Sequence, residues 1–510
     1  MNPFAPGLFL DNRFHSPKGR PRFPVVDPAT GRTVGSSVRA TAEDARAAMD
    51  SAARAQPGWE ALGGRTRAAL LRKAAERLRG FSEELAHLVT LEMGKVLYEA
   101  RGEVAGAVAN FDYYANYGET LTSREVSGLP LGDTLRLVWL PRGVVVAITP
   151  WNFPAATVTR KIAPALVGGN TVVLKPSSAT PLSALLIARA VGEAGLPDGV
   201  LNVVTGPGAE LSKALLTHPA CSTVTLTGST ESGIEVLKTA APRVVKCLLE
   251  LGGKAPVLVA DDADLARAAR ATVFARFWNA GQSCIAAERA YVPESVESAF
   301  VGKLRRLVES LRVGPGSAPG VDLGPLYSAP ARDAVAKDVT SAVEAGAKAI
   351  VGGRRPSTGR LARGAFYLPT VLTEVGDRDR IAREEIFGPV LPVLRYTDFD
   401  EAIARANASR FGLSSYVFTE SASRAERAVR GLRFGETYIN RAGPESPQGY
   451  HAGLRESGLG GEGSLQGVED YLALKSVYVD SRARPSEVGY FPYSSGREPA
   501  GRPRARRKGR

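Results

Sequence analysis

The chain has 510 residues, of which 44% are hydrophobic and 23% are charged, a balance typical of globular proteins. That length exceeds what one hydrophobic core supports, so two or three domains are expected. The net charge is +13, but residues 481–510 hold nine basic and two acidic residues, a surplus of seven. The remaining body is only mildly basic, so nucleic acid is not expected as its partner.

Cysteines are few and irregularly spaced: Cys221, Cys247 and Cys284. Such a set excludes a disulfide framework, and neither these residues nor the four scattered histidines show the spacing of a metal site. A reducing, cytoplasmic setting fits this usage best. The N-terminus lacks the basic-then-apolar order of a signal peptide, and no stretch is apolar enough to cross a bilayer, so no membrane partner is expected.

The first part of the chain predicts short strands followed by helices. Residues 1–40, rich in Pro, Gly and Arg, predict an extended segment with one or two short strands. A cap at Thr41 predicts a helix that ends before Pro57, and two or three further amphipathic helices follow over about 64–118. The alternating run 134–140 predicts a half-exposed strand.

From residue 143 onward, strands and helices alternate. Strands are predicted at 143–148, 170–174, 200–204, 222–226 and 244–249, and helices at 181–193, 209–216 and 231–239. This order predicts a parallel, doubly wound sheet, which binds nucleotides at the carboxyl ends of its strands. A second alternation runs from 253 to about 430, and 468–480 predicts a helix followed by an exposed strand, whose edge another subunit could pair.

Three residues carry candidate chemistry. Cys284, in Gly281-Gln282-Ser283-Cys284, is a candidate nucleophile, since small neighbours let substrate and cofactor approach; taken alone, an inert core cysteine fits better. Glu250 ends an apolar strand before Gly252-Gly253, where partial desolvation suits a general base, although a surface acid fits that position too. Asn152 follows a buried strand and either donates to an oxyanion or caps the next helix.

Two further motifs suit phosphate or ribose. Gly228-Ser229-Thr230-Glu231-Ser232-Gly233 follows a strand and opens a helix, so its backbone N–H groups could face a pyrophosphate; an ordinary turn is the alternative. Lys175 ends another strand of the same sheet and could meet ribose or phosphate.

These residues lie in motifs that resemble the aldehyde dehydrogenase superfamily over about residues 8–480. Six motifs occur in the family's order and at similar spacings: 148–154 (Ile-Thr-Pro-Trp-Asn-Phe-Pro), 161–166 (Lys-Ile-Ala-Pro-Ala-Leu), 226–230 (Leu-Thr-Gly-Ser-Thr), 249–254 (Leu-Glu-Leu-Gly-Gly-Lys), 281–284 (Gly-Gln-Ser-Cys) and 384–389 (Glu-Glu-Ile-Phe-Gly-Pro). Any one of them could arise by chance, whereas six in register are specific.

The resemblance implies an α/β fold with a Rossmann-like cofactor domain, a second α/β catalytic domain and a small β element for oligomerisation. The implied NAD(P)-binding domain spans 1–118 and 141–252, the catalytic domain 253–450, and the bridging element 119–140 and 451–482. A homo-oligomer, dimer or tetramer, is the implied assembly.

The resemblance also implies a role for each matched residue. Cys284 would attack the aldehyde, Asn152 with the Cys284 N–H would bind the oxyanion, and Glu250 would activate the water that hydrolyses the thioester. Lys161 and Glu462 match a proton-relay path that serves the glutamate in some members. The residues implied to contact NAD or NADP are Ile148, Thr149, Pro150, Trp151, Lys175, Ser178, Gly208, Gly228, Ser229, Leu251, Glu385 and Phe387.

Two departures bear on specificity. Members that prefer NAD usually have Glu where this chain has Ser178, so the repulsion of a 2′-phosphate is absent and NADP should be accepted. The segments 434–441 and 448–453 resemble the lactaldehyde/glycolaldehyde dehydrogenase branch, whose hydroxyl-binding residues match Glu445 and His451. That branch has Asn where this chain has Ile285, which favours a broader or more apolar aldehyde range. Phe153 is expected to line the substrate side as well.

The tail, residues 483–510, has no counterpart in the family pattern. Its Arg-rich end is typical of a solvated extension, whereas its aromatic cluster predicts that 486–495 docks on the body or on a neighbouring subunit. Three alternatives to a hydrolytic dehydrogenase are each tied to a feature of the sequence. A CoA-acylating relative would lack Glu250, a non-catalytic relative would lack Cys284 or Glu250, and a tail that binds nucleic acid or another acidic partner would be compatible with catalysis.

Overall fold

The structure is a computed structural model of the whole chain, and it describes residues 6–121, 123–127 and 134–480. Contacts divide the chain into a larger unit, Met1–Thr120 with Pro141–Leu472, and a smaller unit, Leu121–Leu140 with Ala473–Arg510. The tail and its predicted docking segment lie outside the described residues.

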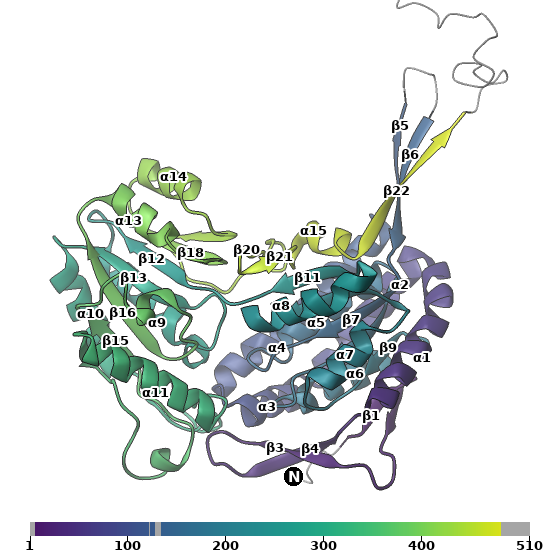
Figure 1. Cartoon of the computed structure of the whole chain (residues 1–510), viewed down its shortest axis with the longest axis horizontal. Helices are drawn as coiled ribbons and strands as arrows, with labels where there is room; N and C mark the ends of the chain where they lie inside the picture. The colour runs from purple at the N-terminus through teal and green to yellow at the C-terminus, as the bar shows by residue number, and fades with distance from the viewer. Residues whose placement is uncertain (1–5, 122, 128–133, 481–510) are drawn as a thin grey trace, which may run out of the picture. The chain divides into compact units, whose positions relative to one another are not determined.

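The first sheet of the larger unit joins eight strands of the described chain (Figure 1). Its central strands are parallel, in the order β9-β8-β7-β10-β11, and its edge strands are antiparallel. The strands are β1 (Leu8–Leu10), β2 (Arg13–His15), β7 (Val144–Ile148), β8 (Thr171–Lys175), β9 (Leu201–Val203), β10 (Cys221–Thr227), β11 (Lys246–Glu250) and β21 (Gly458–Leu459). This is the predicted parallel, doubly wound sheet.

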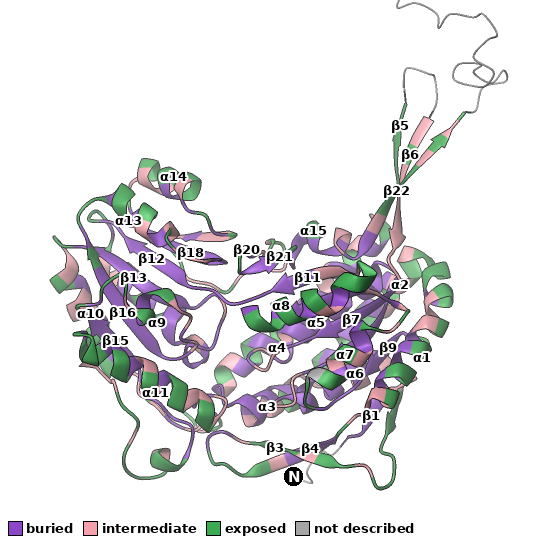
Figure 2. Ribbon diagram, viewed as in Figure 1, coloured by how far each residue is buried: buried purple, intermediate pink, exposed green. Residues whose placement is uncertain are grey.

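Helices cover both faces of this sheet because its central strands are apolar on both sides. In β7, Val144, Val146 and Ile148 pack with α1, α7 and α8, whereas α5 and α6 pack elsewhere on β7, β8 and β9. The helices are α1 (Ala42–Ala61), α2 (Gly63–Gly80), α3 (Ser82–Met93), α4 (Leu97–Ala115), α5 (Ala156–Val167), α6 (Pro181–Glu193), α7 (Ala209–Leu216) and α8 (Thr230–Ala240). Figure 2 shows the buried strands beneath helices whose outer faces are exposed.

Helix α1 begins where predicted, because Thr41 and Asp44 form a capping box. Its predicted end before Pro57 is wrong, since the helix continues to Ala61. Tertiary contacts hold the last turns: Gln56 donates to the carbonyl of Gly169 (2.9 Å), and the buried Trp59 donates to Leu166 O (3.1 Å). These contacts outweigh the hydrogen bond that Pro57 cannot donate.

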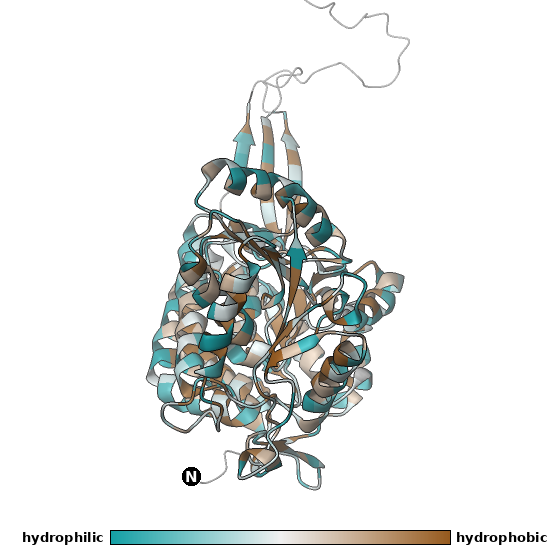
Figure 3. Cartoon of the chain, turned by 90° about the vertical axis from the view of Figure 1, so that its left-hand side faces the viewer, coloured by the Kyte–Doolittle hydropathy of each residue, from teal (hydrophilic) through white to brown (hydrophobic). Residues whose placement is uncertain are grey.

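The second sheet joins seven strands of the described chain and is parallel except at β14. Its strands are β12 (Ala255–Val259), β13 (Ala287–Pro293), β14 (Lys348–Val351), β15 (Thr370–Thr373), β16 (Val390–Tyr396), β18 (Ser414–Phe418) and β19 (Glu436–Ile439). Its helices are α9 (Leu265–Phe277), α10 (Glu297–Glu309), α11 (Ala329–Glu344), α12 (Arg380–Arg383), α13 (Phe399–Asn407) and α14 (Ala422–Gly431). Figure 3 shows hydrophobic strands inside and hydrophilic helix surfaces outside.

The N-terminal segment contains more strands than predicted. Besides β1 and β2 it holds β3 (Arg22–Val26) and β4 (Thr33–Val38), which pair with each other as a separate hairpin. Among the described helices, none has both the length and the apolar character that crossing a bilayer requires.

The smaller unit contains a three-stranded sheet in the order β22-β6-β5. Its strands are β5 (Arg124–Val126), β6 (Thr134–Pro141) and β22 (Leu472–Val479). Residues 451–472, assigned from sequence to the bridging element, make their contacts in the larger unit instead. They include β20 (Leu454–Arg455), which pairs with β17 (Phe411–Gly412), then β21, which pairs with β11, and α15 (Ser464–Glu469). The functional division into domains stays a prediction.

Candidate active site

A cavity of about 1050 Å³ in the larger unit brings most of the predicted catalytic and substrate residues together. Its lining includes Cys284, Glu250, Asn152, Glu462, Glu445, His451, Ile285 and Phe153. These residues come from separate parts of the sequence, so the cavity collects the polar groups that motif spacing alone could not place side by side.

Cys284 is presented by an unusual backbone turn after α9. The short helical turn Trp278–Gly281 contains Asn279 and Ala280 with φ of 53° and 55°, followed by Gly281 with φ of 74°. A Cβ on Gly281 would lie 2.3 Å from Gly388 O, so only glycine fits. Asn279 Nδ2 donates to Gln282 O and to Asn152 O, both at 3.0 Å, which ties this turn to the loop after β7.

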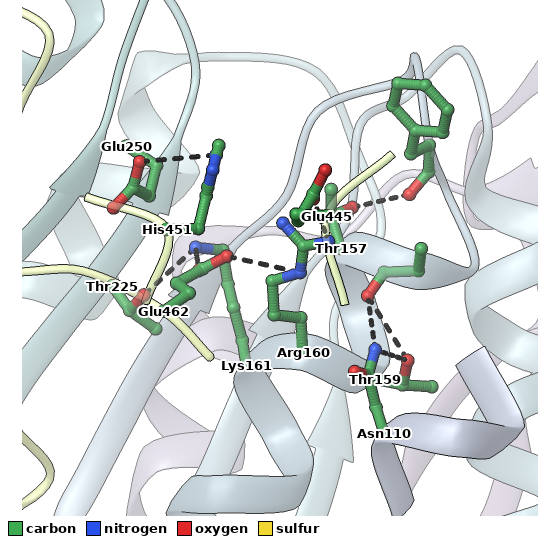
Figure 4. A network of polar contacts seen from close by, with 12 residues as sticks. Asn110, Thr157, Thr159, Arg160, Lys161, Thr225, Glu250, Glu445, His451 and Glu462 are labelled. Atoms are coloured by element: carbon green, nitrogen blue, oxygen red, sulfur yellow. Dashed lines mark hydrogen bonds and ion pairs between the residues drawn. The ribbon is translucent and has the colours of Figure 1, made fainter. Parts of the chain in front are cut away.

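Glu250 stands at the carboxyl end of β11, buried and oriented towards His451 (Figure 4). Neither of its carboxylate oxygens accepts a hydrogen bond from a described residue, and Oε2 lies 3.7 Å from His451 Nε2. Burial raises the pKa of Glu250 to about 8. A carboxyl group of this kind can exchange a proton near neutral pH, as a general base must.

His451 faces Cys284 as well, with Nε2 lying 4.0 Å from Sγ. Burial raises the pKa of the Cys284 thiol, and His451 is the residue that opposes this most strongly. Burial alone would lower the pKa of His451, but Glu436 and Glu250 raise it well above its ordinary value. One imidazole therefore stands between the candidate nucleophile and the candidate base.

Asn152 does not cap the following helix, since α5 starts at Ala156 and Ala155 holds the cap position. Instead its buried Nδ2 donates to Gln282 O at 3.2 Å, and among the described residues its Oδ1 has no partner. The amide is thus held against the segment that carries Cys284, where a donor can serve an oxyanion.

Lys161 and Glu462 form a buried ion pair (Figure 4). Lys161 Nζ also donates to Thr225 Oγ1 at 3.0 Å, and Glu462 lines the cavity. Glu462 bridges His451 through two backbone hydrogen bonds of 2.7 and 2.8 Å. The charges of Glu462 and Lys161 both act on the carboxyl of Glu250, so the pair lies on that side of the site.

Several residues that are expected to contact the nucleotide lie at the carboxyl ends of strands that are neighbours in the first sheet. Ile148 pairs with Lys175 across β7 and β8 and with Leu226 across β7 and β10, and Thr227 pairs with Glu250 across β10 and β11. The residues that follow these ends, Thr149, Pro150, Trp151, Ser178, Gly228, Ser229 and Leu251, therefore share one edge. Gly208 is exposed at the N-terminus of α7, with φ of 110°.

This edge fits a dinucleotide. Lys175 is buried without an ion-pair partner among the described residues, and burial lowers its pKa. The hydroxyls of Thr149 and Thr227 are buried and lack hydrogen-bond partners in the described chain. At Gly233, on α8, a Cβ would lie 2.7 Å from the Leu251 side chain, so the helix packs closely against this edge.

Glu385 and Phe387 reach the site from the second sheet. Glu385 accepts from the N–H of Gly253 at 2.9 Å, directly after the Glu250 strand, and burial raises its pKa to about 8. The ring of Phe387 contacts Trp151 edge-on at 5.5 Å, and Trp151 stacks on Tyr327 at 3.6 Å. Both residues thus stand where a nicotinamide ribose and ring could be held.

Sequence reasoning missed two site residues. Glu436 lies 3.1 Å from His451 Nδ1, and Arg160 pairs with Glu445. The ion pair lowers the pKa of Glu445 to about 2, although its burial acts in the opposite direction. The signals available in the sequence were an acid at the start of the strand Glu436–Ile439 and a second cation, Arg160, next to Lys161 in a mostly apolar helix.

Comparisons with known proteins agree with this architecture. The sequence profile described as "Aldehyde dehydrogenase family" matches residues 14–477. D-glyceraldehyde dehydrogenase (NADP(+)) from Thermoplasma acidophilum is 40% identical, covering 94% of this chain and 97% of its own length. 3,6-anhydro-alpha-L-galactose dehydrogenase from Streptomyces coelicolor is 42% identical, covering 93% and 96%.

Solved structures agree as well. The crystal structure of lactaldehyde dehydrogenase from Escherichia coli superposes with a TM-score of 0.90 at 40% identity, covering 93% of this chain and 99% of the other. A profile match over nearly the whole chain and relatives of this identity show that the protein is an oxidoreductase that belongs to the aldehyde dehydrogenase family.

Proposed function

We propose that the protein oxidises an aldehyde to a carboxylic acid with NAD(P)⁺, through a covalent thioester on Cys284. The observation that carries this proposal is that a cysteine, a buried carboxyl group of raised pKa and a side-chain amide line one cavity. That cavity adjoins the strand edge that fits a dinucleotide.

In the first step the Cys284 thiolate attacks the carbonyl carbon, and the negative charge moves to the carbonyl oxygen. Nδ2 of Asn152 and the backbone N–H of Cys284 are the donors available to stabilise that oxyanion as the thiohemiacetal forms. Asn152 is already held in place through Gln282 and Asn279.

The bound dinucleotide supplies the acceptor for the hydride that the aldehyde carbon loses. Lys175, Gly228 and Ser229 are proposed to hold its adenosine and pyrophosphate, and Glu385 and Phe387 its nicotinamide half. Ser178 carries no negative charge to repel a 2′-phosphate. The relative from Thermoplasma acidophilum is named for NADP(+), which supports NADP as a cofactor here.

Glu250 is proposed to release the acid by taking a proton from a water molecule, which then attacks the thioester. Neither of its oxygens accepts a hydrogen bond from a described residue, so each can accept one from that water. The proton can be passed towards Glu462 and Lys161, which are joined to each other and, through the Glu462 backbone, to His451.

The substrate is proposed to be a small hydroxyaldehyde or a broader range of aldehydes. Glu445, His451 and Arg160 offer polar contacts to a hydroxyl group. Two relatives are named for D-glyceraldehyde and for 3,6-anhydro-alpha-L-galactose, which supports a small hydroxylated substrate here. Ile285 and the aromatic side chains of Phe153, Phe274, Phe277 and Trp278 add apolar surface to the same cavity, which favours the broader range.

A homo-oligomer, dimer or tetramer, is proposed for the assembly, and the cytoplasm for its location. The support for assembly is that β22 leaves Leu474 and Tyr478 51% and 68% exposed. Three free cysteines suit a reducing compartment.

The test is a panel of glycolaldehyde, lactaldehyde and apolar aldehydes of increasing length with each dinucleotide, followed by nicotinamide reduction. Cys284→Ala is the control and should be inactive while keeping the unfolding temperature of the parent protein. Activity that survives in this variant would overturn the mechanism.

A further inference from the structure

Three side chains from distant parts of the chain stand in line. Oε1 of Glu436, on β19, lies 3.1 Å from Nδ1 of His451, whose Nε2 lies 4.0 Å from Sγ of Cys284. We propose that His451 takes the thiol proton of Cys284 and that Glu436 positions the imidazole for this transfer. The inference deepens the proposed function, on which it rests, by naming the group that produces the thiolate.

Hydrogen bonds hold both the backbone of His451 and the Nδ1 atom of its ring, which contacts Glu436. The backbone N–H of His451 donates to Glu462 O, and its carbonyl accepts from Glu462 N. Its partner Glu436 is fixed too, because Oε2 accepts from Tyr438 Oη at 3.0 Å and from Ser414 Oγ at 3.2 Å. In the neutral imidazole a carboxylate at Nδ1 favours the tautomer whose hydrogen is on Nδ1, which leaves the Nε2 lone pair for the thiol. The raised pKa of His451 means that the imidazole, once it has received the thiol proton, holds it as an imidazolium beside the thiolate.

Glu250 is less suited to this transfer. His451 Nε2 lies 3.7 Å from Glu250 Oε2 and 4.0 Å from Cys284 Sγ, so the imidazole contacts both groups. Among the described residues, no hydrogen bond or ion pair links the carboxyl of Glu250 directly to the thiol. Glu250 is thereby left for the later hydrolytic step, and the two steps use different bases.

Burial of the site explains why Cys284 and His451 should ionise together. A lone thiolate in this cavity is costly, and burial raises the pKa of Cys284 accordingly. Transfer to His451 forms a thiolate and an imidazolium together, so no net charge enters the cavity. The other charged groups around the imidazole are the acids Glu250, Glu436, Glu445 and Glu462 and the bases Arg160 and Lys161.

The step balances within the triad. The S–H bond of Cys284 breaks and leaves its electron pair on sulfur, and the proton forms a bond to Nε2 of His451. Nδ1–H continues to donate to Glu436, which gains no proton. The imidazolium Nε2–H then lies 3.7 Å from Glu250 Oε2 and remains a donor as the thiolate attacks the aldehyde carbon.

The simpler alternative is that His451 only hydrogen-bonds a substrate hydroxyl. The alternatives differ in the absence of substrate, where only proton transfer changes the reactivity of Cys284. The measurement is therefore the rate of Cys284 alkylation by iodoacetamide across pH without aldehyde, with Cys284→Ala giving the background from Cys221 and Cys247.

His451→Gln should shift the apparent pKa of alkylation upward by about one unit or more and slow alkylation at about pH 7 roughly tenfold. Glu436→Gln should shift it in the same direction, and the double variant should shift no further than His451→Gln alone, because Glu436 acts through the imidazole. Thr157→Val, an uncharged change in the same cavity, should leave the profile unchanged.

An unchanged alkylation profile in folded His451→Gln would overturn the triad while leaving the proposed dehydrogenase intact. An additive shift in the double variant would overturn the role of Glu436. A failure of the proposed function would be seen in a different experiment: the Cys284→Ala variant would still oxidise aldehydes.

Discussion

The guanidinium of Arg276 lies 2.6 Å from the carboxylate of Glu288, and both side chains are fully buried. Lys254 approaches the same carboxylate at 2.7 Å. Arg276 also donates to Gly281 O (3.1 Å) and to Gly388 O, and Glu288 accepts from the N–H of Ile386 (3.1 Å). This one pair therefore joins the turn before Cys284 to the segment that carries Glu385 and Phe387.

Glu288→Gln should lower the free energy of unfolding by about 3–5 kcal/mol, because two buried cations lose their anion. Chemical denaturation at about pH 7 measures this change in the free energy of unfolding. Glu309→Gln breaks an exposed pair with Arg305 on α10 and should cost less than about 1 kcal/mol. Equal losses in the two variants would contradict the role given to burial.

The same cluster predicts an acid dependence. Burial would raise the pKa of Glu288, but Arg276 and Lys254 lower it from 4.5 to about 2. A group whose pKa is depressed in the folded state stabilises the fold fully above its ordinary pKa and loses that contribution as pH falls. The stability difference between the parent protein and Glu288→Gln should therefore shrink between about pH 4.5 and pH 2. A difference that stays constant over this window would count against the assignment.

Glu250→Gln should separate thioester formation from hydrolysis. We expect a burst of about one reduced nicotinamide per active site, followed by steady-state turnover about 10²–10⁴-fold slower than in the parent protein. Rapid mixing with absorbance detection measures both phases. Glu235→Gln, on the exposed face of α8 where the parent carboxylate pairs with Lys238, is the matched control and should behave as the parent does. Loss of the burst would mean that Glu250 acts before the thioester forms.

The pH dependence of turnover follows from the same residue. Burial raises the pKa of Glu250 to about 8, and only the ionised carboxylate can take a proton from water. For a substrate whose thioester hydrolysis limits the rate, kcat should therefore rise with pH and level off above about 8. A kcat that already levels off near the ordinary carboxyl pKa would contradict a buried base.

Ser178→Glu should change the cofactor preference. A carboxylate at this position, in the turn after β8, would repel the 2′-phosphate and bind the ribose hydroxyls. We expect kcat/KM for NADP⁺ to fall about tenfold or more relative to NAD⁺, which steady-state kinetics with each dinucleotide measures. Ser178→Gln adds similar volume without charge, so an equal effect from it would attribute the change to size.

Ile285→Asn should shift substrate choice towards hydroxyaldehydes. Ile285 is buried, its carbonyl accepts from Tyr416 Oη at 2.6 Å, and its side chain faces Gly443. An amide there should raise kcat/KM for glycolaldehyde relative to an apolar aldehyde about tenfold. Ile285→Leu is the apolar control. If the parent protein already prefers glycolaldehyde strongly, Ile285 does not have the role given to it.

Local sequence pattern by itself determined the parallel sheets and the strand ends that carry Lys175, Gly228 and Glu250. The β-branched run in β7 has to be buried on both faces, and a parallel sheet with helices on each side is how a chain buries it. The resemblance of six motifs to the aldehyde dehydrogenase superfamily made Cys284 and Asn152 candidate site residues, whereas the local pattern around each left other interpretations open.

Only the tertiary structure decided which side chains face them. His451 meets Cys284 across 167 residues, and Glu436 lies behind it on a strand of the second sheet. Tertiary contacts of Gln56 and Trp59 likewise carry α1 past Pro57. Periodicity reports which face of an element is buried. It cannot report which distant group lies opposite, since that depends on how whole elements pack.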